Sequence, residues 1–299
     1  MPKAEVAAAA SAASLARRRK GRAGAWVYAA VAAVCLAIIA PYAWLAISSV
    51  SLRIDLTTVP LKWLPRSINL ENYRQIVAGS SDGGVNASLK TGLFNSLAIA
   101  GSSTLFCLMA GSLAAYVFSR LRFRGKNVVF SFILLTQFMP LIVLIIPIYI
   151  IMSRLGLLNT IPALVIADCA FILPLVIWLM RSYFESIPRD LEEMARIDGC
   201  SRFGTIFRII MPLSTPGLAA SGIFAFIIAW NEFFSALVLS STLRSKTISV
   251  IISEFSSKVG VDYVAMAAAG VVASLPPVIL ALVFQKYIVQ GLTAGAVKG

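Results

Sequence analysis

The chain has 299 residues, of which 59% are hydrophobic and only 13% are charged, and its mean hydropathy is +0.87. A soluble domain carries about 25% charged residues, so this composition indicates a membrane protein rather than a soluble one. The absence of histidine excludes histidine-based catalysis and most transition-metal sites. The net charge of +13 does not indicate a nucleic-acid partner, because the basic residues cluster at the ends of apolar runs, where they set membrane topology.

The first 25 residues are rich in alanine and basic side chains and show no apolar face, so we expect a disordered cytoplasmic tail over 1–25. The apolar run after it is longer than the core of a signal peptide, which favours an uncleaved membrane helix. Six apolar runs are long enough to cross about 30 Å of hydrocarbon, and together they predict an all-α transmembrane domain over 26–288. The runs are approximately Trp26–Val50, Leu93–Ser119, Val128–Met152, Ile161–Met180, Pro216–Leu239 and Val264–Tyr287.

The distribution of basic residues predicts which side of the membrane each loop faces. The side that holds both termini carries 17 Lys and Arg residues, and the other side carries 9. The positive-inside rule therefore places both termini, including the tail over 289–299, and the long polar loop over 181–215 in the cytoplasm. The 51–91 loop lies outside and is large enough for a small surface helix. The four cysteines match neither a disulfide framework nor a zinc motif.

The 181–215 loop is too long to serve only as a connection between two spans. Pro188 to Arg196 has the charge pattern of a short helix, with acids in its first turn, and Gly199 suits the left-handed position that follows a helix. Ser201 can cap a second helix, which Pro212 ends. Its apolar stripe predicts a helix that meets the membrane spans, a partner's groove or the bilayer surface. The stripe consists of Phe203, Ile206, Phe207 and Ile210.

The spacing in this loop resembles the EAA loop of binding-protein-dependent ABC importers. That motif reads Glu-Ala-Ala, three residues, Gly, nine residues, Ile, one residue and Leu-Pro. Its fixed positions are matched here by Glu193, Ala195, Gly199, Ile209 and Pro212. The chain departs from the motif at Met194, in place of the second alanine, and at Met211, in place of the leucine.

The resemblance extends over most of the chain from about Asn69 onward. Several stretches look like the second permease subunit of maltose-, trehalose- and glycerol-phosphate-type systems, which favours a sugar as the transported solute. These stretches are Asn69–Tyr73, Ala114–Tyr116, Phe123–Lys126, Trp230–Phe233 and Gly291–Gly299. The sequence does not decide which sugar is carried.

The resemblance implies a type I ABC importer fold in a bacterial cytoplasmic (inner) membrane. The implied partners are a homologous second permease, two ATPase subunits and an extracytoplasmic solute-binding protein. In this arrangement Glu193 and Asp198 contact basic groups on the ATPase, and Gly199 sets the angle between the two short loop helices. Phe203, Phe207 and Ile210 fill the apolar groove of the ATPase.

The chain contains no phosphate-binding motif of the form G-x-x-x-x-G-K-[ST]. We therefore expect no catalytic residue, no metal and no cofactor on this chain, with ATP and Mg²⁺ used by the partner subunits. The resemblance also implies that the C-terminal tail reaches the ATPase, with Gln290, Lys298 and Gly299 as candidate contacts. A disordered tail is the alternative.

Two acids, Asp168 and Glu232, fall at membrane depth, where an acid costs about 2.5–3.5 kcal/mol on insertion scales. One interpretation places them with Trp230 and Asn231 along the substrate pathway, where they bind sugar hydroxyls and a sugar face. The other gives them hydrogen bonds between spans or contacts with the partner permease.

Two rival functions remain open at this stage. A stand-alone secondary transporter or channel predicts an internal repeat, which is not evident between the two halves, and leaves the 181–215 loop unexplained. The same importer architecture for a non-sugar solute is opposed only by the C-terminal motif.

Overall fold

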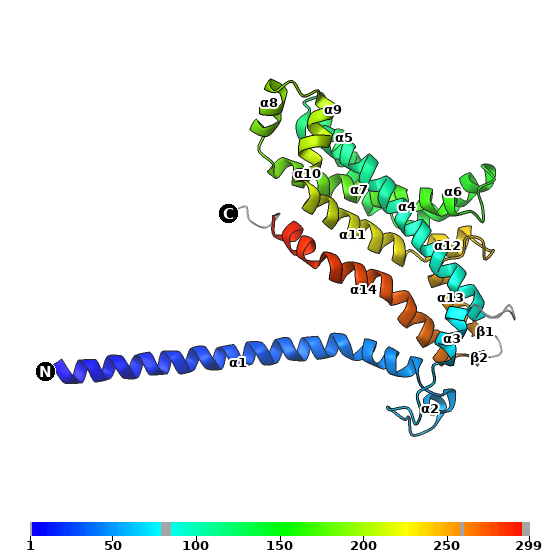
Figure 1. Cartoon of the computed structure of the whole chain (residues 1–299), viewed down its shortest axis with the longest axis horizontal. Helices are drawn as coiled ribbons and strands as arrows, with labels where there is room; N and C mark the ends of the chain where they lie inside the picture. The colour runs from blue at the N-terminus through cyan, green and yellow to red at the C-terminus, as the bar shows by residue number, and fades with distance from the viewer. Residues whose placement is uncertain (1, 79–84, 258–259, 295–299) are drawn as a thin grey trace.

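Long apolar runs form helices here because a helix satisfies its own backbone groups, which a membrane interior cannot do. The computed structural model describes residues 2–78, 85–257 and 260–294, and it confirms the all-α fold, with one antiparallel pair of two-residue strands (Figure 1). In chain order the elements are α1 (Pro2–Ser49), α2 (Arg53–Thr57), α3 (Glu71–Ala78), α4 (Val85–Arg120), α5 (Lys126–Leu135), the 3₁₀ turn η1 (Thr136–Phe138), α6 (Leu141–Arg154), α7 (Ile161–Ser186), α8 (Asp190–Ile197), α9 (Arg202–Thr205), the π-helical turn η2 (Ile206–Ile210), α10 (Met211–Leu213), α11 (Thr215–Asn231), α12 (Phe234–Leu239), α13 (Ile248–Ser253), β1 (Ser256–Ser257), β2 (Gly260–Val261) and α14 (Tyr263–Ala294).

Four helices in the described part of the chain have a stretch long and apolar enough to cross a membrane, and two bent helix pairs raise the number to six. The four stretches are Trp26–Ser49, Ser88–Arg120, Ile161–Ser186 and Tyr263–Tyr287.

The predicted span Val128–Met152 is not one helix, because α5–η1 and α6 meet at an angle of 99°. Met139 and Pro140 between them are both extended, with ψ of 120° and 130°. Pro140 causes the break, because a proline disfavours the helical conformation of the residue before it and lacks an N–H for the ladder.

The predicted span Pro216–Leu239 also has different bounds in the structure. The α11 helix ends at Asn231, because Glu232 is extended with ψ of 120°, and α12 begins two residues later. At its other end, α11 meets the helical segment Arg202–Leu213 at 76°. Only Ser214 separates this segment from the start of α11.

The structure draws α1 as a helix from Pro2, and the expectation of a disordered tail over 1–25 stays a prediction. The alanine-rich composition is compatible with a helix over these residues, because alanine has the highest helix propensity. Figure 1 shows α1 diverging from the other helices and meeting α14 near its own C-terminal end. There Leu45 packs over Gly270, whose added Cβ would lie 3.5 Å from the leucine Cδ atoms.

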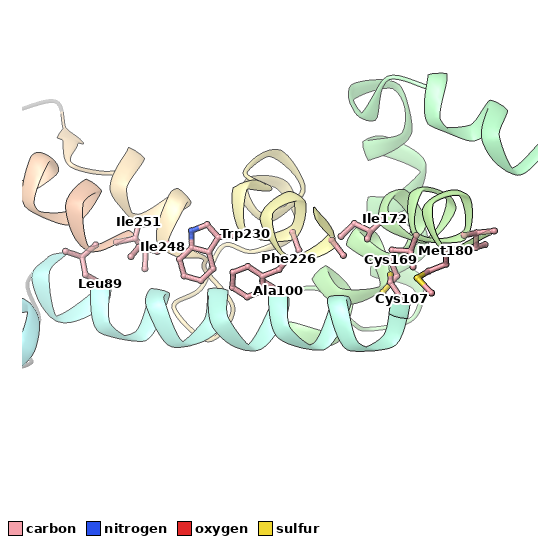
Figure 2. Close-up of a cluster of buried hydrophobic side chains, with 14 of the residues drawn as sticks. Leu89, Ala100, Cys107, Cys169, Ile172, Met180, Phe226, Trp230, Ile248 and Ile251 are labelled. Carbon is pink, nitrogen blue, oxygen red and sulfur yellow. The ribbon is translucent and has the colours of Figure 1, made fainter. Parts of the chain in front are cut away.

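The core lies where α4, α7, α11 and α13 meet, and α14 packs along it. Small residues such as Ala100 let helix backbones approach closely, and branched and aromatic side chains fill the space between them. Figure 2 shows the buried cluster running along α4. Its labelled members are Leu89, Ala100, Cys107, Cys169, Ile172, Met180, Phe226, Trp230, Ile248 and Ile251.

Gly217 holds α11 against α7, and its replacement by alanine should destabilise the fold. An added Cβ would lie 2.5 Å from Cγ of Tyr183, so the ring or the helix must move. We expect a loss of about 1–3 kcal/mol, the usual cost of overpacking, seen as earlier loss of folded protein on heating in detergent. Gly101→Ala is the matched control, because an added Cβ there meets no atom within 4 Å. Equal thermal stability of the two variants would contradict this packing.

Candidate functional site

The helix α8 and the turn after it form as the sequence predicts, within two residues. Asp190, Glu192 and Glu193 occupy the first turn of α8, where the helix dipole favours acids. Gly199 has φ of +85°, its N–H donates to the carbonyl of Arg196 at 3.1 Å, and Cys200 N–H donates to the carbonyl of Ala195 at 2.9 Å. This pair of bonds is the Schellman closure, which a residue without Cβ adopts at least cost. It fixes the direction in which the chain leaves α8.

The second helical segment begins at Ser201, whose Oγ accepts a hydrogen bond from the N–H of Gly204 at 3.1 Å, as expected of an N-cap. The segment continues through η2 and α10, and Ser214 joins it to α11. The wide turn of η2 shifts the side chains relative to a regular helix. The residues of the predicted apolar stripe lie on two faces of this segment.

One face of this segment packs into the protein and the other is exposed. Ile206 and Ile210 are buried, with Ile210 fully inaccessible, whereas Phe203 and Phe207 are 72% and 55% exposed. The prediction that Ile210 enters a partner's groove is therefore wrong, because its side chain is part of this chain's own core. Ile209 is half-buried and Pro212 is exposed.

The exposed face of α8 and the second segment carries both apolar and acidic side chains. Met194 and Ile197 are 60% and 84% exposed, and Glu193 and Asp198 are also exposed. Ala195 is buried beneath them, so only a small side chain fits at that motif position. Exposed apolar groups of this kind mark interaction sites. We call the exposed residues the docking face, and it consists of Glu193, Met194, Ile197, Asp198, Phe203 and Phe207.

The loop is tied to the end of α4 by a buried polar cluster that sequence patterns did not reveal. Arg120 Nε lies 2.5 Å from Glu192 Oε1, and the hydroxyl of Tyr116 donates to Glu192 Oε2 at 2.9 Å. Arg120 also donates from Nη2 to the carbonyl of Ile187 at 2.9 Å. The only sequence signals were the Ala-Ala-Tyr stretch and an acid in the first turn of α8, and neither indicated that the two meet.

Three of the four predicted substrate-pathway residues are buried in the protein or hydrogen-bonded to its backbone. Asp168 is buried in α7, with 4% exposure. Trp230 is also 4% exposed, stacks on Phe226 at a centroid distance of 5.6 Å and donates from Nε1 to the carbonyl of Ala273 at 3.1 Å. Glu232 accepts hydrogen bonds from the N–H groups of Ser235 and Ala236, which caps α12. In this conformation these contacts favour the structural alternative for Trp230 and Glu232.

Asn231 differs from these three because its side chain is exposed. It lines a cavity of about 440 Å³ between α1, α11, α13 and α14, together with Tyr42, Ser249 and Ser274. An amide and two hydroxyls beside aromatic rings suit a polyhydroxylated solute, so Asn231 stays a candidate for the pathway. Gln290 lies in α14, but its side chain is outside the described residues, as are Lys298 and Gly299.

The orientation inferred from the distribution of charge stays a prediction, and the structure shows which elements lie on the same side of the molecule (Figure 1). Figure 1 shows the loop helices α8 to α10 and the C-terminal end of α14 on one side of the bundle, whereas the start of α1 lies well apart from them. The α2, α3 and α13 helices lie at the other end, and α2 and α3 belong to the predicted outer loop over 51–91.

Residues 107–294 match the family described as the inner membrane component of binding-protein-dependent transport systems. The chain belongs to this family. It is therefore a multi-pass inner-membrane protein and a permease subunit of an ABC importer, as its EAA-type loop indicates.

Relatives and a solved structure place the chain more closely. It is 37% identical to the sulfoquinovosyl glycerol transport system permease protein SmoH of Agrobacterium fabrum, over 87% of this chain and 88% of SmoH. It is 38% identical to the trehalose/maltose transport system permease protein MalG of Thermococcus litoralis, over 90% of this chain and 95% of MalG. A chain of a bacterial ABC transporter involved in the import of alginate, an acidic polysaccharide, matches with a TM-score of 0.74 and 25% identity, over 90% of this chain and 98% of that one. These matches confirm the type I importer fold and the carbohydrate-importer branch.

Proposed function

We propose that this permease forms half of the translocation pathway for a sugar or glycoside, and that separate ATPase subunits drive it through the docking face. The observation that carries the proposal is the arrangement of α8 and the second segment. They expose aromatic, aliphatic and acidic groups while their other faces are fixed to the bundle. That arrangement suits a rigid segment that a partner binds and moves.

The acids of the docking face define the kind of partner surface that fits it. Exposed Glu193 and Asp198 favour basic groups at the rim, and the exposed phenylalanines favour an apolar groove at the centre. Closure of two ATPase subunits on ATP and Mg²⁺ would move the docked segment, and α11 with it, because the segment leads directly into that helix. In this scheme the permease itself catalyses no reaction.

The composition and orientation of the complex follow from the same proposal. One homologous second permease, two ATPase subunits and an extracytoplasmic binding protein complete the importer, with the docking face and both termini in the cytoplasm. The greater number of basic residues on that side supports this orientation. The substrate class is supported by the two relatives named above, whose printed substrates are glycosides.

The proposal predicts ATP-dependent sugar uptake by the complete complex and none by this chain alone. The test reconstitutes the permease with its partner subunits and binding protein in proteoliposomes and measures uptake of labelled trehalose, maltose and sulfoquinovosyl glycerol, with methionine as a non-sugar control. Uptake of a sugar only with ATP inside supports the proposal. Equal solute flux through the isolated chain would show a stand-alone transporter instead, and uptake of methionine alone would exclude the sugar assignment.

A further inference from the structure

The cluster of Tyr116, Arg120 and Glu192 joins two elements that are distant in sequence. Tyr116 and Arg120 lie in the last turn and a half of α4, and Glu192 lies in α8. The side chains of Arg120 and Glu192 are only 6% and 5% exposed. One carboxylate oxygen of Glu192 accepts a hydrogen bond from the phenol, and the other lies in ion-pair contact with the guanidinium without hydrogen-bond geometry.

A contribution to stability alone does not account for this arrangement. The cost of desolvating two charges offsets much of their attraction, and apolar pairs of similar volume often stabilise a fold as well. The polar cluster instead fixes the orientation of α8 relative to α4. Arg120 binds Glu192 within α8 and the carbonyl of Ile187 before it, so the guanidinium holds both the helix and its entry. Arg189, between them, donates to the carbonyl of Ser119 at 3.5 Å.

The packing around α8 shows why this helix needs polar contacts with α4. The helix has eight residues, and its chain connections at both ends are short turns. A cavity of about 450 Å³ lies between the end of α4 and the loop helices, lined in part by Val117, Arg196 and Phe203. Apolar packing therefore does not fill this space, and the ion pair and the phenol bridge it. In turn, α4 packs along α7 and α11 over much of its length.

We propose that Tyr116, Arg120 and Glu192 form a latch that transmits movement of α8 to α4. The inference rests on the proposed function, since α8 has to be the element that the ATPase moves. These three are positioning residues: they touch neither nucleotide nor transported solute, and they set how far a displacement of the loop reaches the membrane helices. Movement would then enter the bundle by two routes, through the second segment into α11 and through the latch into α4.

The latch is tested by the ratio of uptake to ATP hydrolysis in the complete reconstituted complex. Glu192→Gln keeps the shape of the side chain but removes its charge, and Tyr116→Phe removes only the hydroxyl. We expect uptake per ATP to fall by about tenfold in Glu192→Gln, which is within the range that loss of a coupling contact causes, and by less in Tyr116→Phe. ATP hydrolysis and co-purification of the ATPase should persist, because neither residue belongs to the docking face.

Glu185→Gln is the matched control, because it breaks an ion pair inside a single helix. Arg181 and Glu185 are 2.8 Å apart, both in α7, and Arg181 also lies over the ring of Phe130 in α5, so the pair joins α8 to no membrane helix. This variant should keep the wild-type ratio. Unchanged ratios in both latch variants, or a proportional fall of uptake and hydrolysis, would overturn the latch.

Two further results distinguish failure of the latch from misassembly of a variant and from failure of the proposed function. If Glu192→Gln assembles poorly, Tyr116→Phe decides, because loss of one hydroxyl leaves the ion pair and the packing in place. Wild-type complexes that show no ATP-dependent uptake would refute the proposed function. If the wild type and both variants, Tyr116→Phe and Glu192→Gln, show the same uptake per ATP hydrolysed, only the latch is refuted.

Discussion

Replacing Gly199 by valine should reduce ATP-driven uptake by about 100-fold, the scale of loss that a small misplacement of a working group causes, while membrane insertion remains intact. Gly199 has φ of +85°, a conformation that costs a β-branched residue about 1–3 kcal/mol. Space is not the problem, because an added Cβ at Gly199 meets no atom within 4 Å. The valine would instead force the backbone out of the closure at the end of α8. The angle between α8 and the second segment would change, and the docking face would lose its shape.

The controls for this prediction come from the same chain. Gly156 has φ of +66° and is equally open, but it follows α6 at the opposite end of the molecule from α8, so Gly156→Val imposes similar strain away from the loop. Gly199→Asn should keep most of the uptake, because asparagine tolerates the left-handed region. Uptake is measured with labelled sugar, and insertion by the amount of complex in the membrane fraction. Normal uptake by inserted Gly199→Val would contradict the lever.

The loop could be predicted closely from the sequence because its signals are local. Proline before an acidic turn, glycine after α8 and serine before the second segment each act within a few residues of the bond that they form. The same is true of the motif spacing that identified the family. These signals fixed the presence and order of the two helices, and the structure moved their ends by only one or two residues.

The direction of the apolar stripe could not be predicted, because it depends on tertiary packing. Helical spacing placed Phe203, Ile206, Phe207 and Ile210 together, but it does not say which of them meets the chain's own bundle. The π-helical turn then changes the phase in the middle of the stripe. In the structure Ile210 faces the core and the phenylalanines face outward.

The polar contacts of the bundle could not be predicted either, because they join residues that are far apart in the sequence. Tyr116 and Glu192 are 76 positions apart, and no periodicity links an α4 position to an α8 position. Glu232 was predicted to lie at membrane depth, yet the sequence could not show that its carboxylate caps α12. A break in the helix has to exist before an acid can cap the next one, and no proline marks that break.

The double variant Phe203→Asp with Phe207→Asp should separate the permease from its ATPase. Both rings are largely exposed, so their replacement should change the stability of the isolated permease by no more than about 0.5 kcal/mol. Their loss from an interface costs about 2 kcal/mol or more for an anchoring aromatic, and a buried carboxylate adds a desolvation penalty. We therefore expect the affinity for the ATPase to fall by about 30-fold or more, with ATP-driven uptake lost in parallel.

Ile68→Asp is the matched control for the docking face. Ile68 is 74% exposed, close to the 72% of Phe203, but it lies in the connection between α2 and α3, away from the loop helices (Figure 1). The measurement is the amount of ATPase that co-purifies with each tagged permease variant, together with its affinity in detergent. If the Phe203/Phe207 variant retains the ATPase as well as Ile68→Asp does, the ATPase grips another surface. The exposed phenylalanines would then have to bind another partner, because two largely exposed aromatic rings on one face are typical of an interaction site.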